Sequence, residues 1–264
     1  MDYEKLRAYL LGNLGLNKSV AENWLSRVSP SEENRPENFV SPAALRQNKA
    51  ENEVYLYGVI VDAMEQAWIE AWLGEGLTVS NTSFRNELND ISGDVVIRID
   101  SPGGSVWQTS GIIAAITERQ KAGDTITARI DGLAASGASL IAVIPSHVAM
   151  APLSHIMIHQ SHSWAFGTSA DLRKSAELLE KTDNQQVSIY SKRLSKSRSE
   201  IMKLLSEETW FSPEEALEAG LVDELVEIDV DANAQLGGAP SEKEVKELLD
   251  RRKQNTKQLY GMAI

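Results

Sequence analysis

The chain has 264 residues, of which 42% are apolar and 24% are charged, enough for one large globular domain with extensions. The absence of cysteine excludes disulfides and thiolate metal sites. The net charge of −12 argues against nucleic acid as a main partner, because binding nucleic acid depends on Lys and Arg side chains that neutralise phosphates.

Both ends of the chain are predicted to be appendages. Residues 2–28 show short helical patterns, and the polar, proline-bearing stretch that follows is typical of a linker. Residues 229–240 resemble a second linker, and a charged helix is expected over 241–260. The predicted organisation is an N-terminal extension over 1–50, a globular domain over 51–228, and a C-terminal linker and helix over 229–264.

Membrane attachment is not expected. No apolar run approaches the ~20 residues that are needed to cross a bilayer. The first residues lack the basic and then apolar layout of a signal peptide. We therefore expect a soluble protein in a cytoplasm.

Within the central domain, runs typical of strands alternate with helical patterns at intervals of ~30 residues. The expected strands cover residues 54–61, 94–100 and 125–131, and the expected helices cover 63–73, 83–91 and 105–122. This alternation indicates βαβ crossovers. The predicted fold class is α/β, with a mainly parallel sheet and helices on its faces.

Two glycine-rich turns, at residues 101–104 and 132–137, follow two of these strands directly. Small residues at such positions let other backbone or a substrate approach closely. Ligands of parallel α/β sheets bind at the carboxyl ends of the strands. The two turns are therefore predicted to form two walls of one site.

Ser136 lies at the centre of the second turn and is a candidate nucleophile. Serine needs a base that takes its proton, and the developing oxyanion needs fixed donors. The expected strand-to-helix turn would point the amide of Gly137 into the site. Taken alone, however, this turn favours a small buried residue without a catalytic role.

The four histidines provide the candidate bases: His147, His155, His159 and His162. His159 follows the alternating run of residues 156–158 at a strand end and is the preferred base, with His162 in the next loop as the alternative. Without cysteine or a helix that pairs two histidines, neither a metal site nor a cofactor is expected. Several acidic residues remain candidates for the group that orients the base.

The C-terminal third of the domain is mostly helical. A helix is predicted over 170–194 with Thr168 or Ser169 as its N-cap, and at ~25 residues it is long for a globular protein. Such a helix is expected to project and to pack on a partner subunit. Shorter helices over 199–205 and 212–220 and a last strand over 221–228 complete the domain.

Five motifs then follow one another in a recognisable order. They are Ser101-Pro102-Gly103-Gly104, Gly132 to Ala138, Met157-Ile158-His159-Gln160, Trp210 to Ala216, and Gly220-Leu221-Val222-Asp223. In this order they resemble the Clp protease proteolytic subunit over about residues 53–228. The resemblance implies a crotonase-like α/β fold and a Ser-His-Asp peptidase.

Carried over position by position, the resemblance implies that Ser136 is the nucleophile and His159 the general base. It also implies an oxyanion hole formed by the amides of Gly137 and of Gly104 or Gly103. The third catalytic position departs from the family, because Glu208 stands where the family has Asp. Glu207 is the alternative for this role.

The resemblance also implies partners. Residues 170–194 match the family's handle helix, through which two rings stack, so homo-oligomeric rings that act on protein or peptide substrates are expected. The two extensions resemble the bacteriophage branch of the family, which cuts scaffold and capsid precursors inside proheads in the host cytoplasm. This favours head maturation over housekeeping proteolysis with an ATPase.

Three other functions compete with this interpretation. An acyl-CoA enzyme of the crotonase fold would also use glycine-turn amides, but it would not need Ser136 and His159. A Ser-Lys peptidase would need a lysine base and usually a membrane anchor. A catalytically silent ring subunit is favoured only by Glu208.

Overall fold

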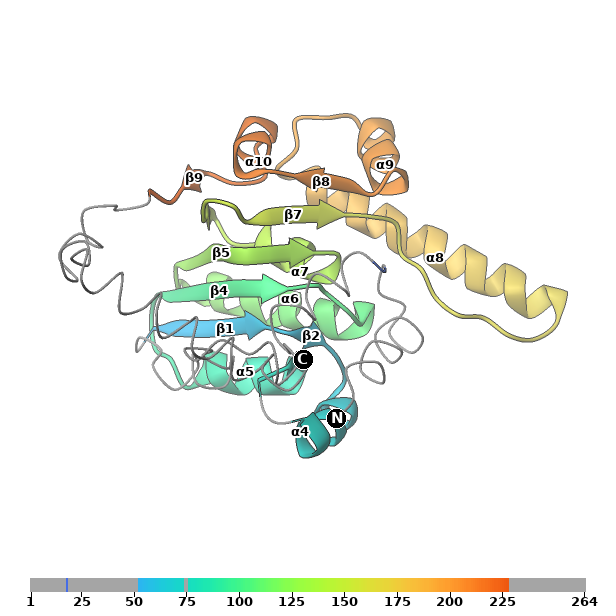
Figure 1. Cartoon of the computed structure of the whole chain (residues 1–264), viewed down its shortest axis with the longest axis horizontal. Coiled ribbons are helices and arrows are strands. Elements are labelled where there is room, and N and C mark those ends of the chain that lie inside the picture. The colour runs from blue at the N-terminus through green and yellow to red at the C-terminus, as the bar shows by residue number, and fades with distance from the viewer. Residues whose placement is uncertain (1–17, 19–51, 74–75, 228–264) are drawn as a thin grey trace, which may run out of the picture. The chain divides into compact units, whose positions relative to one another are not determined.

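The computed structural model describes residue 18 and residues 52–73 and 76–227 (Figure 1). Contacts divide the chain into two units, Met1–Val226 and Glu227–Ile264. The sheet and the candidate site belong to the first unit. The helices expected over 2–28 and 241–260 lie outside the described residues, so the predicted extensions remain predictions.

Seven strands of the described residues form one sheet in the order β1-β4-β5-β6-β9, and β7 joins it by pairing with β5 and β8. The strands are β1 Glu53–Tyr57, β4 Val95–Ser101, β5 Ile126–Ala135, β6 His147–Met150, β7 His155–Ile158, β8 Thr209–Phe211 and β9 Glu224–Leu225. Only β7 and β8 pair in antiparallel fashion within this sheet. The predicted α/β class with a mainly parallel sheet is confirmed.

The helices connect and cover these strands (Figure 1). They are α4 Ala63–Leu73, α5 Asn81–Asn89, α6 Val106–Ala122, α7 Gly137–Ala142, α8 Ser169–Tyr190, α9 Arg198–Ser206 and α10 Pro213–Ala219. α5, α6 and α7 lie against one face of the sheet, and α8 projects past the carboxyl ends of the parallel strands. A second, two-stranded sheet joins β2 Val59–Ile60 to β3 Thr78–Val79.

The strict alternation of β4 separates the two faces of the sheet. Val95, Ile97 and Ile99 are at most 1% exposed and belong to the main hydrophobic core. Burial of each such side chain is worth about 1.5–3 kcal/mol. The residues between them, including Arg98, are only partly buried, and because side chains alternate along a strand they face the other side of the sheet.

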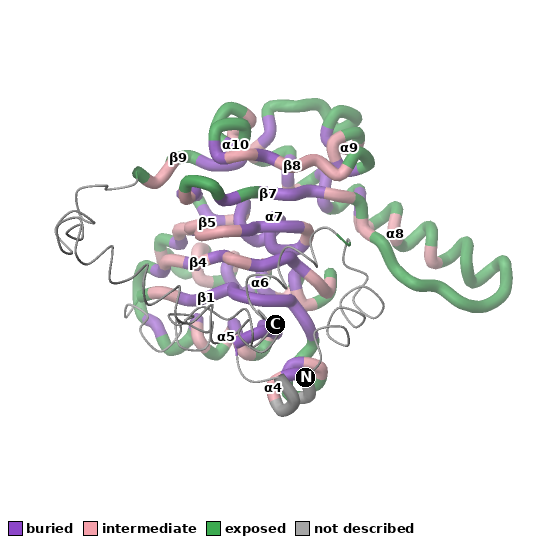
Figure 2. The backbone as a smooth tube through the Cα atoms, in the orientation of Figure 1, coloured by how far each residue is buried: buried purple, intermediate pink, exposed green. Residues whose placement is uncertain are grey.

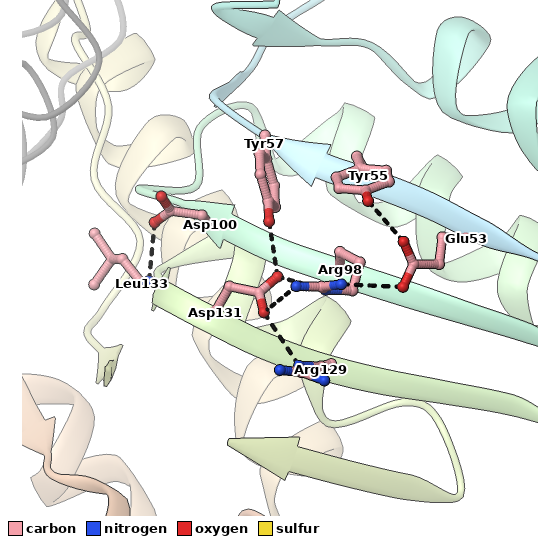
Figure 3. Close-up of polar contacts among 8 residues, drawn as sticks. All are labelled: Glu53, Tyr55, Tyr57, Arg98, Asp100, Arg129, Asp131 and Leu133. Carbon is pink, nitrogen blue, oxygen red and sulfur yellow. Dashed lines mark hydrogen bonds and ion pairs between the residues drawn. The ribbon is translucent and has the colours of Figure 1, made fainter. Parts of the chain in front are cut away.

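That other face carries a polar network across β1, β4 and β5 (Figure 3). The guanidinium of Arg98 donates to both carboxylate oxygens of Asp131 at 2.7 Å and to Glu53 at 3.0 Å. Tyr57 and Tyr55 donate their hydroxyls to Asp131 at 2.8 Å and to Glu53 at 2.6 Å. Because these groups are partly buried and bidentate, we expect them to hold the three strands in register better than a typical surface ion pair would.

A single glycine explains why the strand expected over 54–61 is interrupted. Gly58 has φ +98, and a Cβ at that position would lie 2.3 Å from the carbonyl oxygen of Leu77. The chain therefore turns there, and the run divides into β1 and β2. Neither the division nor β3 was predicted, because both depend on the approach of a segment some twenty residues away.

Several other elements differ from the sequence expectation. α5 begins at Asn81, before the predicted Ser83, because the Ser80 side chain accepts the Ser83 amide and caps the helix. The last strand is confined to Glu224–Leu225, and β8 was not predicted as a strand. α8 is capped by Thr168, one of the two predicted residues, but it ends at Tyr190.

Candidate active site

The turn at Ser136, the predicted nucleophile, is called the nucleophile turn below, and it is tighter than the predicted turn over 132–137. β5 continues to Ala135, and α7 begins at Gly137, so the change of direction falls on Ser136 alone. Ser136 adopts φ 54, which is uncommon for a residue with a side chain. A serine held on a sharp, strained turn between strand and helix is typical of nucleophiles.

The hydrogen bonds around Ser136 hold this strained backbone. Its amide donates to the carbonyl of Met157 at 2.9 Å. Its carbonyl accepts the Ser139 hydroxyl at 2.6 Å and the Leu140 amide at 3.3 Å. A strained conformation persists only where its surroundings over-determine it, and these bonds to strand and helix provide that.

Strand pairing brings His159 to Ser136. β7 pairs in parallel with the end of β5, and Ala135 lies opposite Met157. His159 therefore leaves β7 beside the nucleophile turn. The distance between His159 Nε2 and Ser136 Oγ is 2.8 Å, within range of a hydrogen bond.

The surroundings of His159 favour its neutral form. Burial, and next the neighbouring His162, lower the pKa of His159 to about 4. The centroids of the two rings are 5.0 Å apart. At neutral pH the imidazole is therefore uncharged, and one of its ring nitrogens can accept a proton from the serine hydroxyl.

The two remaining histidines lie on other parts of the sheet. His147 begins β6, and its Nε2 lies 3.0 Å from Glu224 on β9. His155 begins β7, is exposed, and has its ring beside that of Trp210. The structure thus brings together with Ser136 the two histidines that the sequence analysis preferred.

The geometry distinguishes the two alternatives for the first oxyanion donor. The amide of Gly103 donates to Ser101 Oγ at 3.1 Å, whereas Gly104 lines the cavity beside Ser136. Gly104 has φ +146, and a Cβ there would lie 2.1 Å from the carbonyl oxygen of Ile60. This position therefore requires glycine, and Gly104 fits the donor role better than Gly103.

Gly137 is the second predicted donor, and it also lines the cavity. A Cβ at this position would lie 2.4 Å from Oγ1 of Thr109 on α6. The absence of a side chain therefore lets α6 pack against the nucleophile turn. As the first residue of α7, Gly137 has an amide without an acceptor inside its own helix.

The serine, the histidine and both glycines share one small cavity of about 40 Å³. It is lined by Gly104, Val106, Thr109, Ser136, Gly137, Leu140, His159, Ser161, His162 and Gln186. Apart from the two histidines, its side chains are apolar or neutral. Glu207 and Glu208 do not belong to this lining.

Glu208 lies where α9 gives way to β8. The antiparallel pairing of Ile158 with Thr209 brings Glu208, which directly precedes β8, close to the end of β7 that His159 directly follows. Glu208 has φ 51, and its carboxylate accepts the Trp210 Nε1 proton at 3.4 Å. Its role as the orienting acid stays a prediction.

Glu207, the alternative acid, is the C-cap of α9. It is exposed, and its carboxylate lies 3.7 Å from the ammonium of Lys203 one turn earlier. The structure thus gives Glu207 a position on the solvent side of its helix. Of the two acids, Glu208 has the better placement for the predicted role.

The sequence analysis missed two polar residues of α8 next to the cavity, Asp183 and Gln186. They are only 5% and 8% exposed, and both contact the segment that follows His159. In the sequence, Leu179, Val187 and Tyr190 lie at helical spacing and form an apolar stripe. A polar residue at position 183 of that stripe was the available signal, because polar groups are rarely buried without a partner.

The described residues contain neither a cluster typical of a metal site nor a membrane-spanning helix. Between residues 52 and 227, apart from 74–75, no cluster of His, Asp or Glu has the composition of a metal site. Within the same part of the chain, no helix is long and apolar enough to cross a membrane.

The fold and the site together define a class. A mainly parallel α/β sheet presents a serine and a neutral histidine in hydrogen-bond contact, next to two glycine amides at strand ends. These are the components from which serine hydrolases are built.

Comparisons with known proteins give the family. The Clp protease family model matches residues 82–229. The ATP-dependent Clp protease proteolytic subunit 1 of Protochlamydia amoebophila is 34% identical over 147 residues, covering 53% of this chain and 68% of that protein. Subunit 1 of Leifsonia xyli subsp. xyli is 28% identical over 183 residues, covering 65% of this chain and 90% of that protein.

A third relative, subunit 1 of Streptomyces avermitilis, is 34% identical over 135 residues, which cover 51% of this chain and 61% of that protein. The chain belongs to the Clp protease family. This membership implies a peptidase of the serine type.

Proposed function

We propose that this protein is a serine endopeptidase in which Ser136 is the nucleophile and His159 the general base. The observation that carries the proposal is the 2.8 Å distance between His159 Nε2 and Ser136 Oγ. The lowered pKa of His159 supports it, because only a neutral imidazole can take the serine proton.

The proposed reaction begins when Ser136 Oγ attacks the carbonyl carbon of a peptide bond and its proton passes to His159 Nε2. The amides of Gly104 and Gly137 stabilise the resulting oxyanion. His159 then gives the proton to the leaving amine, and an acyl-enzyme remains on Ser136. Water, deprotonated by His159, releases the second product and restores the serine.

Glu208 is the proposed third member of this site. A carboxylate that accepts a hydrogen bond from the other imidazole nitrogen fixes the tautomer and stabilises the imidazolium that forms. The register of β7 and β8 supports Glu208, because Glu208 directly precedes β8 and His159 directly follows β7 at the point where the two strands pair. The longer side chain of Glu than of Asp requires a different approach to the imidazole.

A fluorophosphonate probe tests the activity directly. The wild-type protein should be labelled, and Ser136→Ala should not be. Ser146→Ala, at an exposed serine in the loop before β6, should be labelled like the wild type. A folded, assembled wild-type protein that takes no label would contradict the proposal and favour a silent ring subunit.

For the biological role, we propose processing of viral scaffold and capsid precursors by homo-oligomeric rings in the host cytoplasm or prohead. The support is the presence of extensions on both sides of the family domain, at residues 1–50 and 229–264. The alternative is proteolysis coupled to an ATPase, which is supported by the relatives' name, ATP-dependent Clp protease proteolytic subunit.

Two experiments separate these roles. Mass spectrometry after co-expression with the products of neighbouring genes should identify a structural precursor cut at defined sites. Removal of residues 1–50 should preserve hydrolysis of small peptides and impair cleavage of that precursor. Unchanged processing by the truncated protein would show that the extension is only a tether, and degradation that requires an ATPase would favour the alternative.

A further inference from the structure

The C-terminal half of α8 lies against the segments that carry both proposed catalytic residues. Asp183, Gln186 and Tyr190 are spaced so that they share one side of the helix, and all three are buried. The N-terminal half of the same helix is largely exposed (Figure 2). The buried half thus includes two polar residues and a tyrosine that the proposed chemistry does not use.

One set of hydrogen bonds joins α8 to the two residues that follow His159. The amide of Ser161 donates to Asp183 Oδ1 at 2.7 Å, and Gln160 Nε2 donates to Asp183 Oδ2 at 3.1 Å. Gln186 Nε2 donates to Ser161 Oγ at 2.6 Å. Both carboxylate oxygens of Asp183 are therefore bonded to the two residues that directly follow His159.

A buried carboxylate is costly unless hydrogen bonds compensate for the loss of water. Bonds to an ionised acceptor are shorter and stronger than neutral ones, so they also restrict the position of their donors. Here the donors belong to the chain immediately after His159. Asp183 therefore fixes the position of the chain that directly follows His159.

A second set of hydrogen bonds runs from α8 to the nucleophile. The hydroxyl of Tyr190, which is 0% exposed, lies 2.8 Å from Ser139 Oγ. Ser139 Oγ in turn donates to the carbonyl of Ser136 at 2.6 Å. One helix thus restrains the backbone of the nucleophile and the backbone after the base.

We propose that Asp183 is a positioning residue for peptide hydrolysis, which holds His159 at its 2.8 Å distance from Ser136, with Gln186 and Tyr190 in supporting roles. This inference rests on the proposed serine peptidase function. A positioning residue should act on the chemical step more than on substrate binding, because misplacement of the base by about 1 Å can cost on the order of 10² in rate.

The test compares Asp183→Ala and Asp183→Asn with the wild type on a fluorogenic peptide. The Ala variant should lower kcat on the order of 10²-fold while KM stays within about threefold. The Asn variant should lose about tenfold, because its Oδ1 still accepts the Ser161 amide while its NH₂ group cannot accept from Gln160. Labelling by the fluorophosphonate should slow in the same order.

Two further variants provide a control and a second test. Glu180→Gln makes the same carboxylate-to-amide change at an exposed position one turn earlier and should leave kcat within about twofold. Gln160→Met removes one donor to Asp183 at an exposed residue and should reproduce the loss of the Asn variant. Thermal unfolding and sedimentation of every variant establish that fold and assembly are retained.

A kcat equal to that of the wild type in folded, assembled Asp183→Asn and Gln160→Met would overturn the inference. If Asp183→Ala does not fold, the kcat values of Asp183→Asn and Gln160→Met are sufficient to test the inference. A raised KM with unchanged kcat would also overturn the inference, because Asp183 would then serve substrate binding. Failure of the peptidase proposal looks different, since the wild type itself would then neither cleave peptide nor take label.

Discussion

Ser136 and Glu208 share an unusual backbone and differ in how firmly it is held. Both have positive φ, 54 for Ser136 and 51 for Glu208, at turns that face the same end of β7. Ser136 is fixed by bonds to a parallel strand and to the first turn of α7. Glu208 follows the end of a short helix, and its amide donates to Leu205 at 3.3 Å.

The turn at Ser136 is therefore pre-organised, whereas the turn at Glu208 is adjustable. The nucleophile turn lies at the centre of the sheet, where its neighbours are buried and closely packed. The Glu208 turn lies at the outer edge, next to the antiparallel strand β8. A longer acidic side chain is more easily accommodated at such an edge than a change at the nucleophile would be, because packing there leaves more freedom.

The largest expected effect comes from removal of the base. His159→Ala should reduce peptide cleavage about 10⁶-fold, because the serine hydroxyl then keeps its proton. His162→Ala should retain most of the activity, since His162 is the exposed neighbour of the base. Cleavage of a fluorogenic peptide measures both, and the reverse result would move the role of base to His162.

Replacement of the acid should have the second largest effect. Glu208→Gln should lower kcat by up to about 10⁴-fold, because an amide cannot stabilise the imidazolium or enforce its tautomer. Glu208→Asp should lose less, and Glu207→Gln should stay near the wild type. Equal activity of Glu208→Gln and the wild type would mean that another group orients His159.

A smaller effect is expected where α6 packs on the nucleophile turn. Gly137→Ala should lower stability by about 1–3 kcal/mol and also lower kcat, because the new methyl group would overlap Thr109 Oγ1. The double variant with Thr109→Ala should recover part of both losses. Urea unfolding and peptide cleavage measure the coupling, and simple additivity of the two changes would argue against this contact.

The smallest effect concerns the pH profile. His159 is active when neutral, so activity should fall as the pH drops through its pKa of about 4. His162 lowers this pKa, so His162→Gln should raise it and move the acidic limb of kcat/KM to higher pH. An unchanged acidic limb would show that burial alone sets the pKa of His159.

Local patterns predicted most of the elements and singled out Ser136 and His159, which the structure brings into hydrogen-bond contact. The alternation of strand and helix patterns predicted the α/β class, and the pattern before His159 placed this residue correctly at a strand end. The capping sequences predicted Thr168 as one of two N-caps and α10 from Ser212 to Gly220. Such features depend on neighbours within a few residues, so a sequence contains them directly.

Tertiary structure decided how these pieces meet. The parallel pairing of β5 with β7 sets the distance from Ser136 to His159, and the path of the chain around Ile60 and Thr109 determines which glycines are indispensable. Asp183 gained its partners only because α8 packs beside the strand end. Contacts between residues far apart in the chain depend on packing and register, and no local pattern in the sequence specifies these distances.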